Sequence, residues 1–168
     1  MESINPFSSV PLTVIIDGAP VPKPRMTRSD KWKQRRCVME YRAWADKCRR
    51  TIFGGNVNVR FCEEDNIELI LMSFYLPIPP SYSMKKKKEV EYSLHKIRPD
   101  IDNLEKSVLD ALFLKDSVVP AVFKRKFFTS INEKPKTCLT FFRRGHIRKE
   151  ALDYNASVTR FLLRSGNP

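Results

Sequence analysis

The chain has few of the residues that build disulfide frameworks or zinc sites, and it lacks the long apolar run of a membrane span. Its 168 residues include four cysteines and two histidines, and no two cysteines form a C-x-x-C pair. Such a chain is expected to hold neither a disulfide framework nor a Cys/His zinc site. No apolar run approaches the roughly 20 residues that a membrane span needs, and the first ten residues do not resemble a signal peptide. These absences predict a cytoplasmic protein with reduced, mostly buried cysteines.

Acidic side chains are in the minority. The sequence has 31 lysines and arginines against 19 aspartates and glutamates, which gives a formal net charge of +12. A balance of this sign favours a polyanionic partner, with nucleic acid as the first expectation and an anionic membrane surface as the alternative. A hydrophobic content of 42% is typical of a globular protein, and the length predicts one domain.

Apolar residues recur with strand and helix periods in turn, which predicts an α/β fold. The expected strands lie at residues 12–16, 67–75, 118–130 and 136–143. The expected helices lie at residues 35–53, 102–113 and 151–163, and a short helix can form over the lysines of the polar connection at 81–98. We expect a mixed β-sheet flanked by helices in a single domain, with a hairpin through residues 132–135 joining the last two strands.

One acidic stretch stands out against the basic background. Asp100 and Asp102 follow an Arg-Pro pair, and Lys106 comes one helical turn after Asp102. At about 100° per residue, Asp102, Lys106 and Asp110 share one helix face, opposite the apolar stripe. Carboxylate oxygens suit Mg²⁺, which usually takes one or two of them alongside phosphates. The spacing alone fits either a metal site or an ordinary surface ion pair between Asp102 and Lys106.

A longer pattern surrounds this stretch. Residues 98–106, RPDIDNLEK, and residues 108–112, VLDAL, resemble the central signature of the RusA family of Holliday junction resolvases, many of them encoded by phages and prophages. Residues 18–25, residues 80–83 with the lysines after them, and residues 116–127 resemble flanking segments of the family in the same order. The resemblance spans residues 12–143.

The resemblance implies a RusA-like nuclease domain over residues 12–145, between an N-terminal tail at 1–11 and a helical C-terminal extension at 146–168. It implies a homodimeric, Mg²⁺-dependent endodeoxyribonuclease that resolves branched DNA by paired nicks in recombination and repair. Asp100, Asp102 and Asp116 would hold the Mg²⁺, or Mn²⁺, which shares its hard oxygen ligands. Lys106 would complete the catalytic set.

One part of the pattern departs from the family. Only five residues separate Asp110 from Asp116, fewer than family members usually have, and Asp116 has no second aspartate beside it. The shorter connection leaves open whether Asp116 reaches the metal and whether Asp110 joins it. It also motivates a second hypothesis, a non-catalytic protein that binds branched DNA. A nuclease that prefers flaps or forks is a third, separate alternative.

Cations also gather outside the acidic stretch. Because each neutralised phosphate releases counterions, we expect these cations to contact DNA, with a solvated charge run as the simpler alternative. The predicted DNA contacts are Lys23, Arg25, Arg28, Lys85, Lys86, Lys87, Lys88 and Lys126. Trp32 lies between two lysines in a polar loop, where stacking on an unpaired base and packing are both open roles.

Overall fold

The computed structural model describes residues 11–143 of the chain. The predicted C-terminal extension at 146–168, with its helix at 151–163, and residues 1–10 of the predicted tail lie outside the described residues. Within residues 11–143, no helix is long and apolar enough to cross a membrane.

The described chain contains both strands and helices, joined in places by short 3-10 turns. The strands are β1 (Leu12–Asp17), β2 (Ile67–Leu76), β3 (Ala121–Phe128) and β4 (Lys136–Arg143). The helices are α1 (Arg36–Ile52), α2 (Met84–Val90) and α3 (Ile101–Leu112), and the short 3-10 turns are η1 (Arg28–Lys31), η2 (Glu63–Asp65) and η3 (Asp116–Val118). Each strand and helix predicted within these residues is present, with ends that differ by a few residues.

The four strands form one mixed sheet in the order β1-β4-β2-β3. β4 pairs antiparallel with β1 and β2, whereas β2 pairs parallel with β3. The predicted hairpin between β3 and β4 is therefore wrong, because β2 lies between them. A parallel pair needs a long crossover, and the connection through α2 and α3 supplies it. The predicted α/β class is confirmed.

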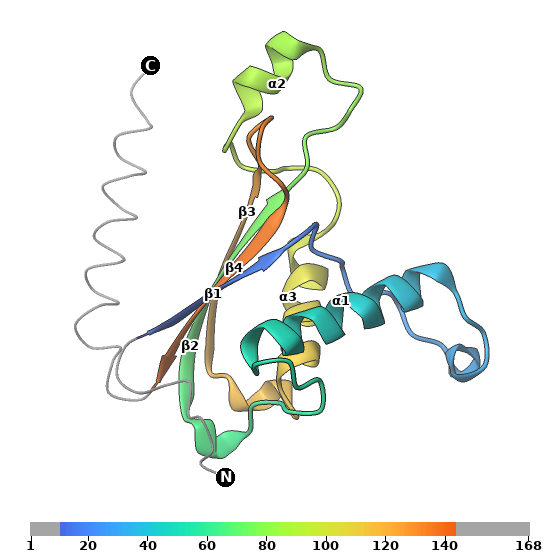
Figure 1. Cartoon of the computed structure of the whole chain (residues 1–168), viewed down its shortest axis with the longest axis vertical. Coiled ribbons are helices and arrows are strands. Elements are labelled where there is room, and N and C mark those ends of the chain that lie inside the picture. The colour runs from blue at the N-terminus through green and yellow to red at the C-terminus, as the bar shows by residue number, and fades with distance from the viewer. Residues whose placement is uncertain (1–10, 144–168) are drawn as a thin grey trace.

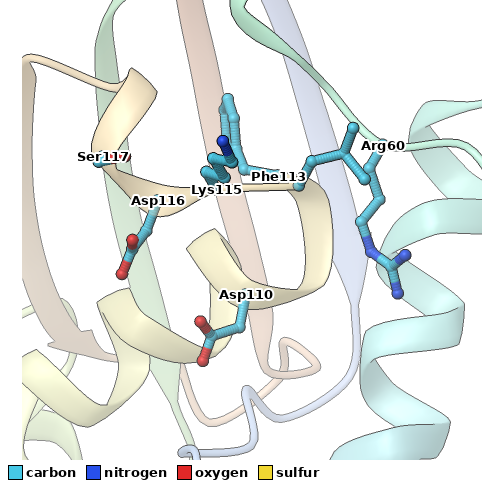
Figure 2. A pocket seen from close by; sticks show the side chains of 7 residues that line it. Arg60, Asp110, Phe113, Lys115, Asp116 and Ser117 are labelled. Atoms are coloured by element: carbon cyan, nitrogen blue, oxygen red, sulfur yellow. The ribbon is translucent and has the colours of Figure 1, made fainter.

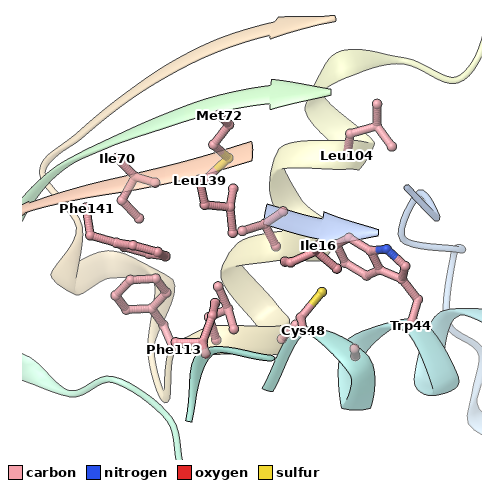
Figure 3. Close-up of a cluster of buried hydrophobic side chains, with 14 of the residues drawn as sticks. Ile16, Trp44, Cys48, Ile70, Met72, Leu104, Phe113, Leu139 and Phe141 are labelled. Carbon is pink, nitrogen blue, oxygen red and sulfur yellow. The ribbon is translucent and has the colours of Figure 1, made fainter. Parts of the chain in front are cut away.

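The core lies between the sheet and the helices α1 and α3 (Figure 1; Figure 3). α1 contributes Trp44 and Cys48 and α3 contributes Leu104 and Val108, all of them at most 5% exposed. Burying one aliphatic side chain of this size stabilises the fold by about 1.5–3 kcal/mol. α3 is thereby anchored on the sheet, and its opposite face is held in a defined position.

The cysteines follow the prediction only in part. All four are free thiols, but only Cys48 is buried, whereas Cys37 is exposed and Cys62 and Cys138 are half-buried. Cys37 stands in the first turn of α1, where the neighbouring Val38 takes the core-facing position. Burial raises the pKa of the Cys48 thiol to about 12, so this cysteine behaves as a small apolar core residue.

Candidate active site

Helix α3 presents the acidic stretch on its exposed face. Asp100 is the N-cap residue, and Asp102 lies in the first turn, where the helix dipole stabilises a carboxylate. Leu104 and Val108 are buried on the opposite face, while Asp102 and Lys106 are exposed. The structure therefore places these two predicted site residues together on the solvent side of one anchored helix.

A lysine from the sheet approaches the start of this helix. Lys124 of β3 donates from Nζ to Asp102 Oδ1 at 2.5 Å and also to Glu105 Oε2. Burial lowers the pKa of Lys124, but the hydrogen bonds to the two carboxylates outweigh it, and the pKa is raised. The Asp102 side chain remains 83% exposed, so it is open to a ligand from solution. Sequence reasoning missed Lys124 and Glu105, because their contact joins two elements that no local pattern relates.

A basic cleft separates α3 from the loop that follows β1. The cleft has a volume of about 400 Å³ and is lined by Lys23, Pro24, Arg25, Met26, Asn103 and Lys106. The Lys23 backbone N–H donates to Asn103 O at 3.0 Å, and Lys23 Nζ forms an ion pair with Asp110. These contacts bring two predicted DNA contacts, Lys23 and Arg25, alongside the predicted catalytic lysine.

Asp116 shares a different cleft with Asp110. Asp116 opens the η3 turn between α3 and β3. It lines a cleft of about 430 Å³ together with Asp110 and Arg60. Figure 2 shows the carboxylates of Asp110 and Asp116 directed to the same side of the chain. The five-residue connection thus groups Asp116 with the end of α3, while Asp100 and Asp102 stand at its beginning.

The acidic side chains do not form a closed cage. Among residues 11–143, no three or more Asp, Glu, His and Cys side chains are grouped so that they could hold a metal ion by themselves. Mg²⁺ usually takes one or two protein carboxylates and completes its shell with waters and substrate phosphates. The exposed carboxylates of Asp100 and Asp102 offer donors of this kind, so the residues present fit Mg²⁺. The assignment of Asp100, Asp102 and Asp116 as ligands stays a prediction.

Lys126 supports the segment that leads into α3. Its Nζ donates to the carbonyl oxygens of Ile97 and Pro99, both at 2.6 Å. The Lys126 carbonyl in turn accepts from the His95 backbone N–H at 3.0 Å. The ammonium predicted to contact DNA is thus engaged with the backbone just before Asp100. The sequence did not reveal this role, because Pro99 and Ile97 lie 27 and 29 residues before Lys126 along the chain.

The other predicted DNA contacts lie on two separate basic segments. The lysines at 85–88 are on α2, and the Ser83 hydroxyl at its N-cap accepts from the Lys86 N–H at 3.3 Å. Arg28 opens η1 and is exposed. Figure 1 shows α2 and the η1 loop at different extremities of the described chain.

A basic α/β domain that exposes carboxylates and a lysine on one helix belongs, by its chemistry, with proteins that act on nucleic acid. The family model described as Endodeoxyribonuclease RusA matches residues 17–132. The match covers more than half of the chain, and the chain belongs to the RusA endodeoxyribonuclease family. None of the curated proteins compared with the chain matches it.

Family membership defines the class of reaction. The chain is an endodeoxyribonuclease, a hydrolase that acts on DNA, and its family acts on branched junction DNA. The predicted catalytic set, Asp100, Asp102, Lys106 and Asp116, lies entirely within the matched residues. The family and the enzyme class predicted from the sequence are therefore confirmed.

Proposed function

We propose that this endodeoxyribonuclease resolves Holliday junctions by paired, Mg²⁺-dependent nicks, in DNA recombination and repair. One observation carries the proposal: α3 exposes Asp102 and Lys106 one helical turn apart, and Lys106 lines a cleft together with Lys23 and Arg25. Oxygens that suit a divalent cation and cations that suit a DNA backbone therefore meet along one helix.

The carboxylates would hold the divalent ion. Asp100 and Asp102 would supply oxygens from the first turn of α3, and Asp116 would approach from η3. Mg²⁺, or Mn²⁺, when bound lowers the pKa of the attacking water and stabilises charge on the phosphoryl oxygens. The part played by the chain is to anchor α3 on the core, so that these oxygens face solvent where DNA can reach them.

Lys106 would act on the DNA itself. Its side chain is exposed on the Asp102 side of α3 and lines the basic cleft with Arg25. A preorganised cation aimed at a phosphate stabilises the charge that builds in the transition state, and one such donor contributes about 3 kcal/mol. Removal of the Lys106 charge should therefore slow cleavage more than it weakens DNA binding.

We also propose a homodimer, because a four-way junction has two-fold symmetry and paired nicks need two identical sites. The molar mass measured by light scattering during size-exclusion chromatography should be twice that of the 19.6 kDa chain. A mass of one chain, both free and on a junction, would contradict the dimer.

A DNA substrate also supports a cytoplasmic location for this protein.

A nicking assay on a synthetic four-way junction tests the function, with Mg²⁺, Mn²⁺ or EDTA in parallel. We expect nicks at symmetrically related positions with either ion and none with EDTA. Asp102→Asn should bind the junction as the wild type does but cleave it about 100-fold more slowly or worse, because an amide is a poorer ligand for a divalent cation.

Glu63→Gln is the matched control, since it removes the same charge from an exposed carboxylate on η2, outside both clefts. Its cleavage rate should equal that of the wild type. A fully active Asp102→Asn enzyme, or cleavage in EDTA, would overturn the metal assignment. Flap and fork substrates belong in the same assay, and faster cleavage of these than of the four-way junction would overturn the proposed substrate.

A further inference from the structure

We propose that Trp32 is a base-stacking residue that recognises unstacked nucleobases at the branch point of junction DNA. The inference rests on the proposed function, because it assigns a recognition element for the same substrate. It concerns the loop between β1 and α1, which holds no residue of the predicted catalytic set.

Trp32 is unusually exposed for an aromatic side chain. It exposes 79% of its surface, the largest fraction among the large apolar side chains of residues 11–143. The second tryptophan, Trp44, is 5% exposed and belongs to the core. Packing within the described chain is therefore excluded as the role of Trp32. An indole ring presented to solvent offers a wide flat face, which a planar partner such as a nucleobase covers well.

A buried carboxylate holds the loop around Trp32 in one shape. Asp30 is 6% exposed, and its two oxygens accept from Nε and Nη2 of Arg35, both at 2.6 Å. The Thr27 N–H donates to the same carboxylate at 2.6 Å, and Arg35 Nη2 also donates to Arg25 O at 2.8 Å. Hydrogen bonds from Arg35 and Thr27 hold the pKa of Asp30 well below its usual range. Such a preorganised loop loses little conformational entropy when a partner binds.

The charge around Trp32 selects a polyanion. Residues 23–36 contain seven lysines and arginines and a single acidic residue, Asp30, which Arg35 neutralises. Arg28 and Lys33 are exposed. Cations beside an exposed aromatic ring are typical of sites for single-stranded nucleic acid, where the cations contact the backbone and the ring stacks on a base. An acidic peptide would satisfy the cations but would leave the indole face without a planar partner.

The loop is also tied to the helix that carries the candidate catalytic residues. At its start, the Lys23 N–H donates to Asn103 O at 3.0 Å, and Lys23 Nζ pairs with Asp110. Nine residues span at most about 30 Å, so Trp32 lies within one turn of duplex DNA from Lys23. Figure 1 shows the η1 segment projecting past the N-terminal end of α1, away from the sheet. A junction bound in the basic cleft can therefore also reach Trp32.

Stacking on a base distinguishes branched DNA from duplex DNA. Inside a duplex, neighbouring bases cover both faces of each base, and extruding one of them costs free energy. At a branch point the strands exchange partners, and an indole ring can replace a missing neighbour. Because every base has a π-face, this recognition selects the branch without selecting a sequence.

Affinities of Trp32 variants for DNA test the proposal, measured in EDTA to prevent cleavage. Trp32→Ala should bind a four-way junction about 5- to 150-fold more weakly than the wild type, the range expected for the loss of one stacked base. Trp32→Phe should recover most of the affinity, whereas Trp32→Leu, apolar but not planar, should not. Met39→Ala is the matched control, because Met39 is an exposed apolar residue of α1. It should bind junctions like the wild type, and all variants should bind duplex DNA equally.

Tryptophan fluorescence gives an independent readout. Because Trp44 is buried, quenching by acrylamide reports mainly on Trp32, and the Trp32→Ala protein supplies the Trp44 background. We expect a bound four-way junction to protect Trp32 from acrylamide, and a bound duplex to give no protection.

The outcomes separate this inference from the function on which it rests. Equal junction affinities for the wild type and Trp32→Ala would overturn the stacking role while leaving junction cleavage intact. Equal protection by duplex and junction, or protection by anionic vesicles in place of DNA, would also overturn it. A wild-type protein that neither binds nor cuts any branched DNA would instead overturn the proposed function.

Discussion

Lys124 Nζ lies 2.5 Å from Asp102 Oδ1, so a lysine of the sheet donates a hydrogen bond to an oxygen of a candidate metal ligand. The same ammonium also contacts Glu105. A positive charge in this position competes with a divalent cation for the carboxylates. Lys124 is therefore expected to set how tightly the free enzyme holds the ion.

Lys124→Met keeps the length of the side chain and removes its charge. We expect this variant to bind Mn²⁺ up to about fivefold more tightly in the absence of DNA, since an exposed ion pair is worth at most about 1 kcal/mol. Titration calorimetry measures the affinity directly. Lys134→Met removes the same charge from the exposed connection between β3 and β4 and should leave the affinity unchanged. Weaker binding by Lys124→Met would show that Lys124 orients the carboxylates rather than competing for them.

Substitution of Asp116 tests whether the shortened connection after α3 still brings this carboxylate to the metal ion. If it ligates the ion, Asp116→Asn should lower both Mn²⁺ affinity and the cleavage rate at least about tenfold, the usual effect of disturbing a metal site. Ser117→Ala is the neighbouring control, because Ser117 lines the same cleft without offering a carboxylate. Full activity of Asp116→Asn would exclude this residue from the site, and Asp110→Asn would then test the other carboxylate in the cleft.

Lys126 should matter for stability more than for DNA affinity. Lys126→Met leaves the Ile97 and Pro99 carbonyls without their donor. Water can reach these carbonyls, so we expect a loss of about 1 kcal/mol in the free energy of unfolding. Urea denaturation measures this loss. Lys85→Met on α2 should show the opposite behaviour: unchanged stability, and a salt dependence of DNA binding that is weaker by about one counterion. The same weakening in Lys126→Met would favour a direct DNA contact.

His95 should make the stability of the protein depend on pH. The side chain is 5% exposed and its ring packs on Phe128 with centroids 4.4 Å apart. Burial, followed by the charge of Lys126, lowers the pKa of His95 below its ordinary value. The unfolded chain then takes up this proton at a higher pH than the folded chain does. The free energy of unfolding should therefore fall as the pH drops through about 6.5.

Urea denaturation at pH 7.5, 6.5 and 5.5 measures this dependence. His95→Gln should flatten it, because glutamine does not titrate in this range. An equally steep loss of stability in the variant would assign the effect to other groups.

The strands and helices were predictable because each depends on local periodicity. The apolar spacing in α1 and α3 gave their buried stripes, and β4 was predicted with its observed ends. The pairing of strands was not predictable in the same way. β3 and β4 are adjacent along the chain, which suggested a hairpin, but the apolar strand β2 takes the position between them.

The residues of the candidate site were likewise predictable only where they depend on local spacing. Asp100, Asp102 and Lys106 follow from one short stretch and the geometry of one helix, so the sequence alone placed them together. Lys124 and Glu105 were missed, and Lys126 was assigned to DNA, because their contacts cross from β3 to α3 and to the segment before it.

By itself, the amino-acid sequence determined the family, the acidic face of α3 and the basic character of its surroundings. These depend on composition, on short motifs in a fixed order along the chain and on the spacing of residues within one helix. Only the tertiary structure decided which charges meet. It joined Lys124 to Asp102 and Lys23 to Asp110, grouped Asp116 with Asp110, and left Trp32 exposed on a loop held by Asp30 and Arg35. The physical reason is that ion pairs and burial depend on distances through space, which chain packing sets and local spacing does not.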